Sequence, residues 1–205
     1  MVTTPDQMKQ ALDWLAGVEP GFAAALERVG YPEPRVRDRG YETLLRTIIG
    51  QQVSVKAAAS IWNKLAAGLG DLTRPETILD ADETVLRSFG LSRQKQSYAR
   101  SLAALVAEGA LDLHHLPEDD EAAIALLTQI KGIGRWSAEI YLLFAEGRPD
   151  IWPAGDLAVQ IEIGRLLGLA ERPSERLVRQ LAEAWRPHRG AAAILAWHHY
   201  NTTTI

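Results

Sequence analysis

The sequence predicts an all-α protein. Apolar residues recur at helical spacing in segment after segment, residues that favour helix starts precede these segments, and glycines follow them. No stretch of convincing length alternates apolar and polar residues as a half-buried strand would. We therefore expect many short helices joined by tight turns.

The expected helices of the first half can be placed from these signals. Thr4-Pro5 opens the first helix because proline suits the first helical position, and this helix runs to Gly17 with Trp14 in the core. A second helix covers residues 20–29, and residues 31–34 break the pattern. Helical spacing returns at residues 41–52, and Ser54 is expected to cap the helix that follows.

Further start signals mark the second half. Short helices are expected after Pro75 and Asp82, and Ser92 is expected to cap a long helix that ends at Gly109. Acidic residues at 118–120 suit the positive end of another helix. The last three helices are expected at residues 156–167, 174–185 and 189–200.

Composition limits the possible functions. The chain has 205 residues, 47% of them hydrophobic, and no cysteine, which excludes disulfides, cysteine-ligated zinc and iron–sulfur clusters. No export signal or membrane span is recognisable, so we expect a cytoplasmic protein. The net charge of −4 argues against general coating of nucleic acid, but it leaves room for a narrow basic footprint.

The segment Ile130-Lys-Gly-Ile-Gly134 lies between two expected helices. Its glycines permit positive φ, and the helix that begins near Arg135 directs free amides into the turn, where they can bind a phosphate oxygen. The simpler interpretation is a glycine cap in an ordinary helical hairpin.

A single carboxylate follows at a short distance. Asp156 precedes an amphipathic helix, and Asp is a preferred residue at a helix start. From spacing alone, capping is the simpler interpretation. A capping role and a chemical role are compatible, because the cap fixes the side chain and the helix terminus favours its negative charge.

The segment Leu127-x-x-Ile-x-Gly-Ile-Gly-x-x-x-Ala138 resembles the helix-hairpin-helix of the DNA base-excision glycosylase superfamily. Three more segments are similar to parts of that superfamily, and together the matches run from about residue 40 to residue 200. These segments are Thr47-Ile-Ile-Gly-Gln-Gln-Val-Ser54, Gly90-Leu-Ser-Arg-Gln-Lys-Gln-Ser-Tyr98, and Trp185-Arg-Pro-His-Arg189 with Trp197. The last resembles the 3-methyladenine DNA glycosylase II branch.

The resemblance implies a role for individual residues. Asp156 stands where the superfamily has its essential aspartate, which stabilises positive charge on the deoxyribose and orients or deprotonates water. Trp136 and Trp197 match tryptophans of the base pocket, with Tyr141 and Trp152 as further candidates, although each tryptophan at helical spacing also suits a core. Where the branch has a tyrosine, this chain has Ile140, which leaves the shape of the pocket open.

The expected DNA contacts come from the hairpin and from one earlier helix end. Gln51 and Gln52 are expected to fill the gap left by the extruded base or to contact the opposite base. The hairpin contacts are expected from Lys131, Gly132, Ile133, Gly134 and Arg135. Lone basic residues and polar residues at helix ends are also common on solvated surfaces. The alternative is therefore that these residues are ordinary surface residues with no contact to DNA.

Lyase-type members carry a Schiff-base lysine two residues after the second hairpin glycine, where this chain has Trp136. The resemblance thus implies a monofunctional enzyme. We expect no metal site, because the histidine pairs 114–115 and 198–199 point apart on a helix. We also expect no cofactor, although the resemblance leaves open a monovalent cation on hairpin carbonyls.

The expected protein is an all-α enzyme with two helical lobes and the active site in the cleft between them. One lobe covers residues 31–148 and carries the hairpin, and the other combines residues 1–30 with 149–205. We expect a monomer that acts on double-stranded DNA containing a damaged base and releases alkylated purines, 3-methyladenine first and 7-methylguanine second. The alternatives are a glycosylase for another lesion (uracil, a mismatched base or an oxidised base) and a non-catalytic DNA-binding module.

Overall fold

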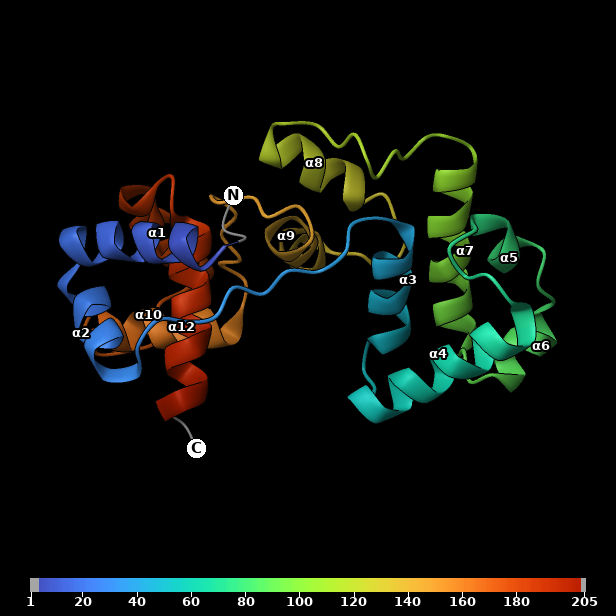
Figure 1. Ribbon diagram of the computed structural model, residues 1–205, viewed down its shortest axis with the longest axis horizontal. Helices are drawn as coiled ribbons and strands as arrows, with labels where there is room; N and C mark the ends of the chain where they lie inside the picture. The colour runs from blue at the N-terminus through green and yellow to red at the C-terminus, as the bar shows by residue number, and fades with distance from the viewer. Residues whose placement is uncertain (1–3, 204–205) are drawn as a thin grey trace. The chain divides into compact units, whose positions relative to one another are not determined.

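The computed structural model describes residues 4–203, and within that range every regular element is a helix (Figure 1). The all-α prediction is confirmed. Several of the expected caps are present as hydrogen bonds: the hydroxyl of Ser54 accepts from the Ala57 amide at 3.2 Å, and that of Ser92 accepts from the Lys95 amide at 3.3 Å. Short polar side chains thus set these helix starts.

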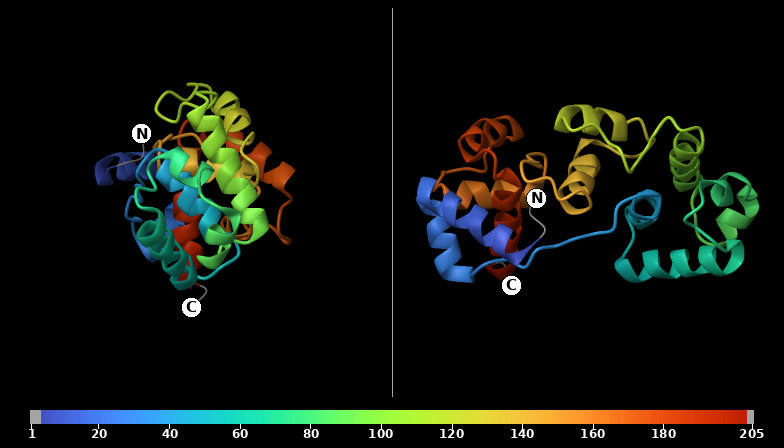
Figure 2. Two further views of the ribbon diagram at one scale, coloured as in Figure 1. Left: turned by 90° about the vertical axis from the view of Figure 1, so that its right-hand side faces the viewer. Right: turned by 45° about the horizontal axis from the view of Figure 1, so that its top comes forward.

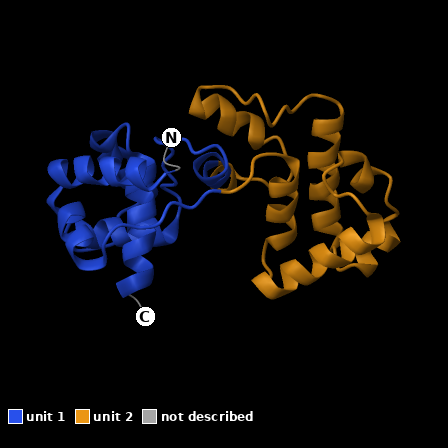
Figure 3. Ribbon diagram, viewed as in Figure 1, with its two compact units in different colours: residues 1–36, 139–205 blue, residues 37–138 orange. Residues whose placement is uncertain are grey.

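The chain divides into two compact units, which are coloured separately in Figure 3. Unit 1 combines Met1–Val36 with Glu139–Ile205, and unit 2 is Arg37–Ala138. The expected bounds of 31 and 148 differ from these because of local packing. The Tyr31 hydroxyl donates to Asp13 in the first helix, and Phe144 packs its ring against Trp197 with 5.8 Å between centroids.

Unit 1 is organised around its last helix, α12, which contacts α1, α2 and α10 (Figure 1). A core of large rings lies beside it: Phe22 and Trp185 meet edge to face at 4.9 Å. The helices of this unit are α1 (Pro5–Val18), α2 (Pro20–Val29), α10 (Leu157–Leu166), α11 (Glu175–Leu181), the 3-10 helix η1 (Ala182–Trp185) and α12 (Arg189–Thr203).

One core prediction was wrong. Trp14 is 40% exposed, and it meets the ring of His188 edge to face at 5.1 Å. Helical spacing placed Trp14 near the apolar stripe of α1, but Met8, Leu12 and Leu15 fill the buried face and leave the indole at its edge.

Unit 2 is organised around α7, which contacts α3, α5 and α6; the views in Figures 1 and 2 show the short helices beside it. Leu44, Leu45, Ile48 and Leu102 are fully buried there. The helices of this unit are α3 (Tyr41–Gly50), α4 (Val55–Leu69), α5 (Pro75–Leu79), α6 (Glu83–Ser88), α7 (Arg93–Ala107) and α8 (Asp120–Leu127). A further helix, α9 (Arg135–Phe144), begins after the glycine hairpin and crosses the division between the units.

Candidate active site

The hairpin in unit 2 depends on one glycine. Gly132 has φ +81°, and a Cβ there would lie 2.1 Å from the ring of Tyr98 on α7, so no other residue fits without a shift. The Lys131 amide donates to the Ser101 hydroxyl at 3.1 Å, and Ile133 is buried. The turn is thus seated on α7 through Lys131 and Gly132. The Ile133 side chain is buried, so only its backbone could contact a ligand.

The second hairpin glycine differs from the first. Gly134 is exposed, has no positive φ, and a Cβ there would meet nothing within 4 Å. Its carbonyl accepts the Ala138 amide at 3.0 Å, so α9 starts immediately after it. Folding alone does not require glycine here, whereas the close approach of a ligand to the helix start would.

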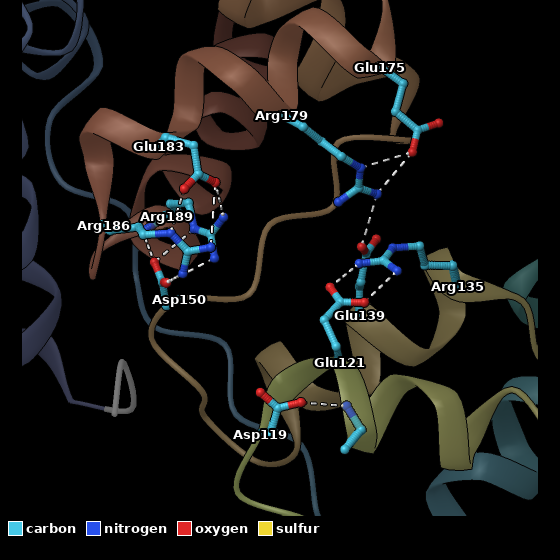
Figure 4. Close-up of polar contacts among 11 residues, drawn as sticks. Asp119, Glu121, Arg135, Glu139, Asp150, Glu175, Arg179, Glu183, Arg186 and Arg189 are labelled. Carbon is cyan, nitrogen blue, oxygen red and sulfur yellow. Dashed lines mark hydrogen bonds and ion pairs between the residues drawn. The ribbon is translucent and has the colours of Figure 1, made fainter.

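Arg135 takes part in a surface ion pair. Both of its terminal nitrogens bond the carboxylate of Glu121 on α8, one of them at 2.8 Å (Figure 4). Both side chains are substantially exposed, so the pair is weak and can exchange for a phosphate. Lys131 is exposed beside it.

Gln51 and Gln52 follow α3 in the same unit and have different roles in the fold. The Gln51 side chain donates to the Gly132 carbonyl at 2.8 Å and so braces the hairpin. Gln52 is exposed with φ +55°, the one non-glycine residue with positive φ among those the structure describes. Such a conformation is costly and is typical of functional positions.

Trp136, on the first turn of α9, is 48% exposed and belongs to unit 2 with the hairpin. An indole this exposed is rare in a core, and indole rings are well suited to stacking. Tyr141 and Trp152 are buried in the structure.

Trp152 is buried in unit 1. Its indole nitrogen donates to the Val178 carbonyl at 3.2 Å, and its ring meets Trp185 edge to face at 5.5 Å. Both its polar atom and its ring are therefore committed to the interior of unit 1. Trp152 precedes α10 in an irregular segment, so helical spacing says nothing about its surroundings.

Asp156 caps α10, as its position in the sequence indicates. Its Oδ1 accepts the Val159 amide at 3.0 Å and also the indole Nε1–H of Trp197 at 3.0 Å. The structure therefore brings together two of the residues singled out from the sequence, Asp156 and Trp197, although α10 and α12 are separated by 22 residues of chain. The indole acts as a donor to the carboxylate, which the sequence did not indicate.

A recess of about 180 Å³ adjoins Trp197 within unit 1. The rings of Trp197 and Phe144 form part of its wall, tilted by 32° to each other. The remaining wall consists of Pro32, Glu33, Arg35, Ile194 and His198. Phe144 was not predicted, because no local pattern marks a residue that meets a helix so far away in the sequence.

The segment that leads to Asp156 is fixed by polar contacts. Gln160 donates its side-chain amide to the Ala154 carbonyl at 2.8 Å, and the Asp156 amide donates to the Pro153 carbonyl at 2.9 Å. Glu139, buried on α9, accepts from Arg179 of α11 at 3.2 Å, and Arg179 also bonds Glu175 at 2.9 Å (Figure 4). The Gln160 and Asp156 bonds hold the start of α10, and the Arg179 bonds join α9 to α11.

The capacity for metal ions is small in the described part of the chain. Residues 4–203 contain no group of three or more His, Cys, Asp or Glu side chains placed to hold a metal ion. The hairpin carbonyls of Ile130 and Gly132 each accept one hydrogen bond, from the Ile133 amide and from Gln51, and keep a second lone pair for a cation. In the same residues, no helix has the length and apolar character needed to cross a membrane.

An all-helical protein with a glycine hairpin and a helix-capping aspartate bonded to an indole belongs among the helix-hairpin-helix DNA repair proteins. Residues 45–187 match the model of the HhH-GPD superfamily of base excision DNA repair proteins, and the chain belongs to that family.

Known relatives agree with this assignment. DNA-3-methyladenine glycosylase 1 of Schizosaccharomyces pombe is 33% identical over 190 residues, which cover 89% of this chain and 83% of the relative. The crystal structure of a DNA-3-methyladenine glycosidase from Bacillus halodurans has a TM-score of 0.87 and 27% identity, covering 98% of this chain and 93% of that one. The S. pombe 3-methyladenine DNA glycosylase Mag1, solved in complex with abasic DNA, has a TM-score of 0.76 and 30% identity, covering 96% and 97%.

Proposed function

We propose that this chain is a monofunctional DNA glycosylase that releases alkylated purines, 3-methyladenine first and 7-methylguanine second, and leaves an abasic site. The observation that carries the proposal is the pair of N–H donors on one oxygen of Asp156. They fix a single carboxylate at the positive end of α10, as a reaction that develops positive charge on a sugar requires. The relatives named as 3-methyladenine glycosylases support the same substrate class.

The DNA is held through backbone amides at the start of α9. A helix start with an exposed glycine lets a phosphate approach closely, and Lys131 adds a positive charge beside it. Gln52 then occupies the space of the extruded nucleotide, while Gln51 braces the hairpin. The partner is double-stranded DNA from which one base has been flipped out.

The chemistry requires only the carboxylate and water. An N3- or N7-alkylated purine is already cationic, so it leaves without a strong acid, and an aromatic face such as that of Trp197 attracts it by about 0.5–2 kcal/mol. Asp156 stabilises the cationic sugar and orients the attacking water. Position 136 carries an indole in place of an amine, so no Schiff base forms there and the DNA backbone stays intact.

The test is incubation of the protein with methylated duplex DNA, followed by identification of the freed bases and of strand breaks. We expect free 3-methyladenine and breaks only after alkali. A parallel panel of duplexes containing uracil, a mismatch or an oxidised purine checks the lesion class. If base is released from only one of those duplexes, the substrate is that lesion and not an alkylated purine. If the protein binds DNA but releases no base from any duplex, the chain is a DNA-binding module.

A further inference from the structure

The segment of residues 149–156 is attached to α12 at both of its ends. At the first end, the Gly190 amide donates to the Pro149 carbonyl at 2.8 Å. Next to it, Arg189 binds both oxygens of Asp150, with Nε–Oδ1 at 2.9 Å and Nη2–Oδ2 at 2.8 Å (Figure 4). A two-point bond between a planar guanidinium and a carboxylate fixes orientation as well as distance.

The first attachment is sheltered from solvent. The side chains of Arg189 and Asp150 are 12% and 16% exposed, whereas Arg186, which also bonds Asp150 at 2.6 Å, is 51% exposed. Glu183 bonds both arginines from the solvent side. Among these charges, the Arg189–Asp150 pair is the one that can hold a fixed geometry, because exposed pairs contribute little.

The backbone approach at this end is also close. A Cβ at Gly190 would lie 2.7 Å from the Pro149 carbonyl oxygen and 2.8 Å from a methyl of Leu143. The first turn of α12 therefore touches the main chain of the segment directly. Any rotation of Arg189 or of the helix start moves Pro149 and Asp150 with it.

The second attachment is the bond from Trp197 Nε1 to Asp156 Oδ1. Trp197 follows Arg189 by eight positions on α12, which corresponds to about 12 Å along the helix axis. The segment between the two attachments is held by the Trp152 indole on Val178 and by Gln160 on Ala154. The register of this segment along α12 thus decides whether Asp156 meets the indole.

We propose that Arg189 is a positioning residue for Asp156. It touches neither DNA nor the reacting atoms; it sets the place of residues 149–156 along α12 so that the Asp156 carboxylate reaches Trp197. This inference rests on the proposed function, because it assigns Arg189 to the presentation of the reacting carboxylate. A displacement of about 1 Å at a reacting group can lower a rate by about a hundredfold.

The experiment compares Arg189→Lys with Arg186→Lys. Lysine keeps the charge at each position and removes the two-point fork. Arg186 bonds the same Asp150 carboxylate but lies outside α12, so it is the matched control. We expect Arg189→Lys to lower the single-turnover rate of base release by about tenfold to a hundredfold. The affinity for a duplex with an abasic site should stay within about threefold, and Arg186→Lys should react like the wild type.

A second measurement separates positioning from plain stability. Trp197→Phe removes the other attachment. If both attachments serve one purpose, their effects on the rate are not additive, so the double variant Arg189→Lys with Trp197→Phe should react about as slowly as the slower single variant. Independent structural damage would instead multiply the two losses. If Arg189→Lys fails to fold, Asp150→Asn with Arg189→Gln removes both charges and leaves no unpaired charge inside, so the rate can be measured on that folded protein.

The outcomes are distinct. The positioning role is overturned if Arg189→Lys releases base as fast as the wild type. It is also overturned if the rate losses of Arg189→Lys and Trp197→Phe multiply in the double variant. Either result leaves the proposed function standing. Absence of release by the wild type would instead remove the proposed function itself. A slow Arg189→Lys variant with normal DNA affinity and overlapping losses supports the inference.

Discussion

The indole of Trp197 and the amide of Val159 donate to the same oxygen of Asp156, each at 3.0 Å. One donor comes from the helix that Asp156 caps and the other from α12, so the carboxylate is oriented by local and by long-range structure together. A helix cap needs only the first of these bonds. The second is therefore the feature that separates a reacting carboxylate from a simple cap.

Replacing Asp156 by Asn tests that separation. An Asn side chain caps a helix almost as well as Asp, so the free energy of unfolding should change by less than about 0.5 kcal/mol. The reaction needs the negative charge, so base release should fall by about a hundredfold or more. Denaturant unfolding and quantification of freed 3-methyladenine check the two parts. An Asp156→Asn variant as active as the wild type would remove Asp156 from the mechanism.

Trp197→Phe removes the indole donor and keeps an aromatic ring against Phe144. A hydrogen bond to a charged group contributes about 1.5–3 kcal/mol, so we expect base release to slow by about tenfold or more, with DNA affinity nearly unchanged. Trp14→Phe is the matched control, because Trp14 lies in the same unit, is 40% exposed and has its ring against His188. Equal rates for the two variants would contradict the role of the indole donor.

The local part of this architecture was predictable from the sequence. Ser54, Ser92 and Asp156 cap helices where their positions indicated, because capping depends on residues three positions apart. The hairpin glycines were also recognisable, since positive φ at Gly132 is a property of the residue and its turn.

The long-range part was not predictable. The Trp197–Asp156 bond, the Arg189–Asp150 pair and the Phe144–Trp197 contact join residues 39 to 53 positions apart. Helical spacing says which residues share a face, but not which other element that face meets. For the same reason the sequence did not show that the Trp152 indole donates to Val178 or that the Trp197 indole donates to Asp156.

The two hairpin glycines should separate folding from DNA binding. Gly132→Ala forces a side chain into positive φ and against Tyr98, so we expect a loss of roughly 1–3 kcal/mol of unfolding free energy. Gly134→Ala meets nothing within 4 Å, so stability should hold while the methyl group blocks a phosphate and weakens DNA binding by about tenfold. Thermal unfolding and duplex titration measure both. Undiminished binding by Gly134→Ala would show that the phosphate does not approach this glycine.

Gln52 offers the sharpest test of how the gap in the DNA is filled. Gln52→Gly and Gln52→Ala both remove the side chain, but only glycine relieves the positive φ of 55°. We therefore expect the Gly variant to be more stable than the Ala variant by up to about 1 kcal/mol. Base release should nevertheless fall by a similar factor in both, because neither can occupy the space of an extruded nucleotide. Chemical denaturation and single-turnover release measure the two effects on the same preparations. If the rate of base release differs between the Gly and Ala variants as their stabilities do, the strained backbone matters and the side chain does not. If both variants release base at the wild-type rate, Gln52 has no part in holding the nucleotide out.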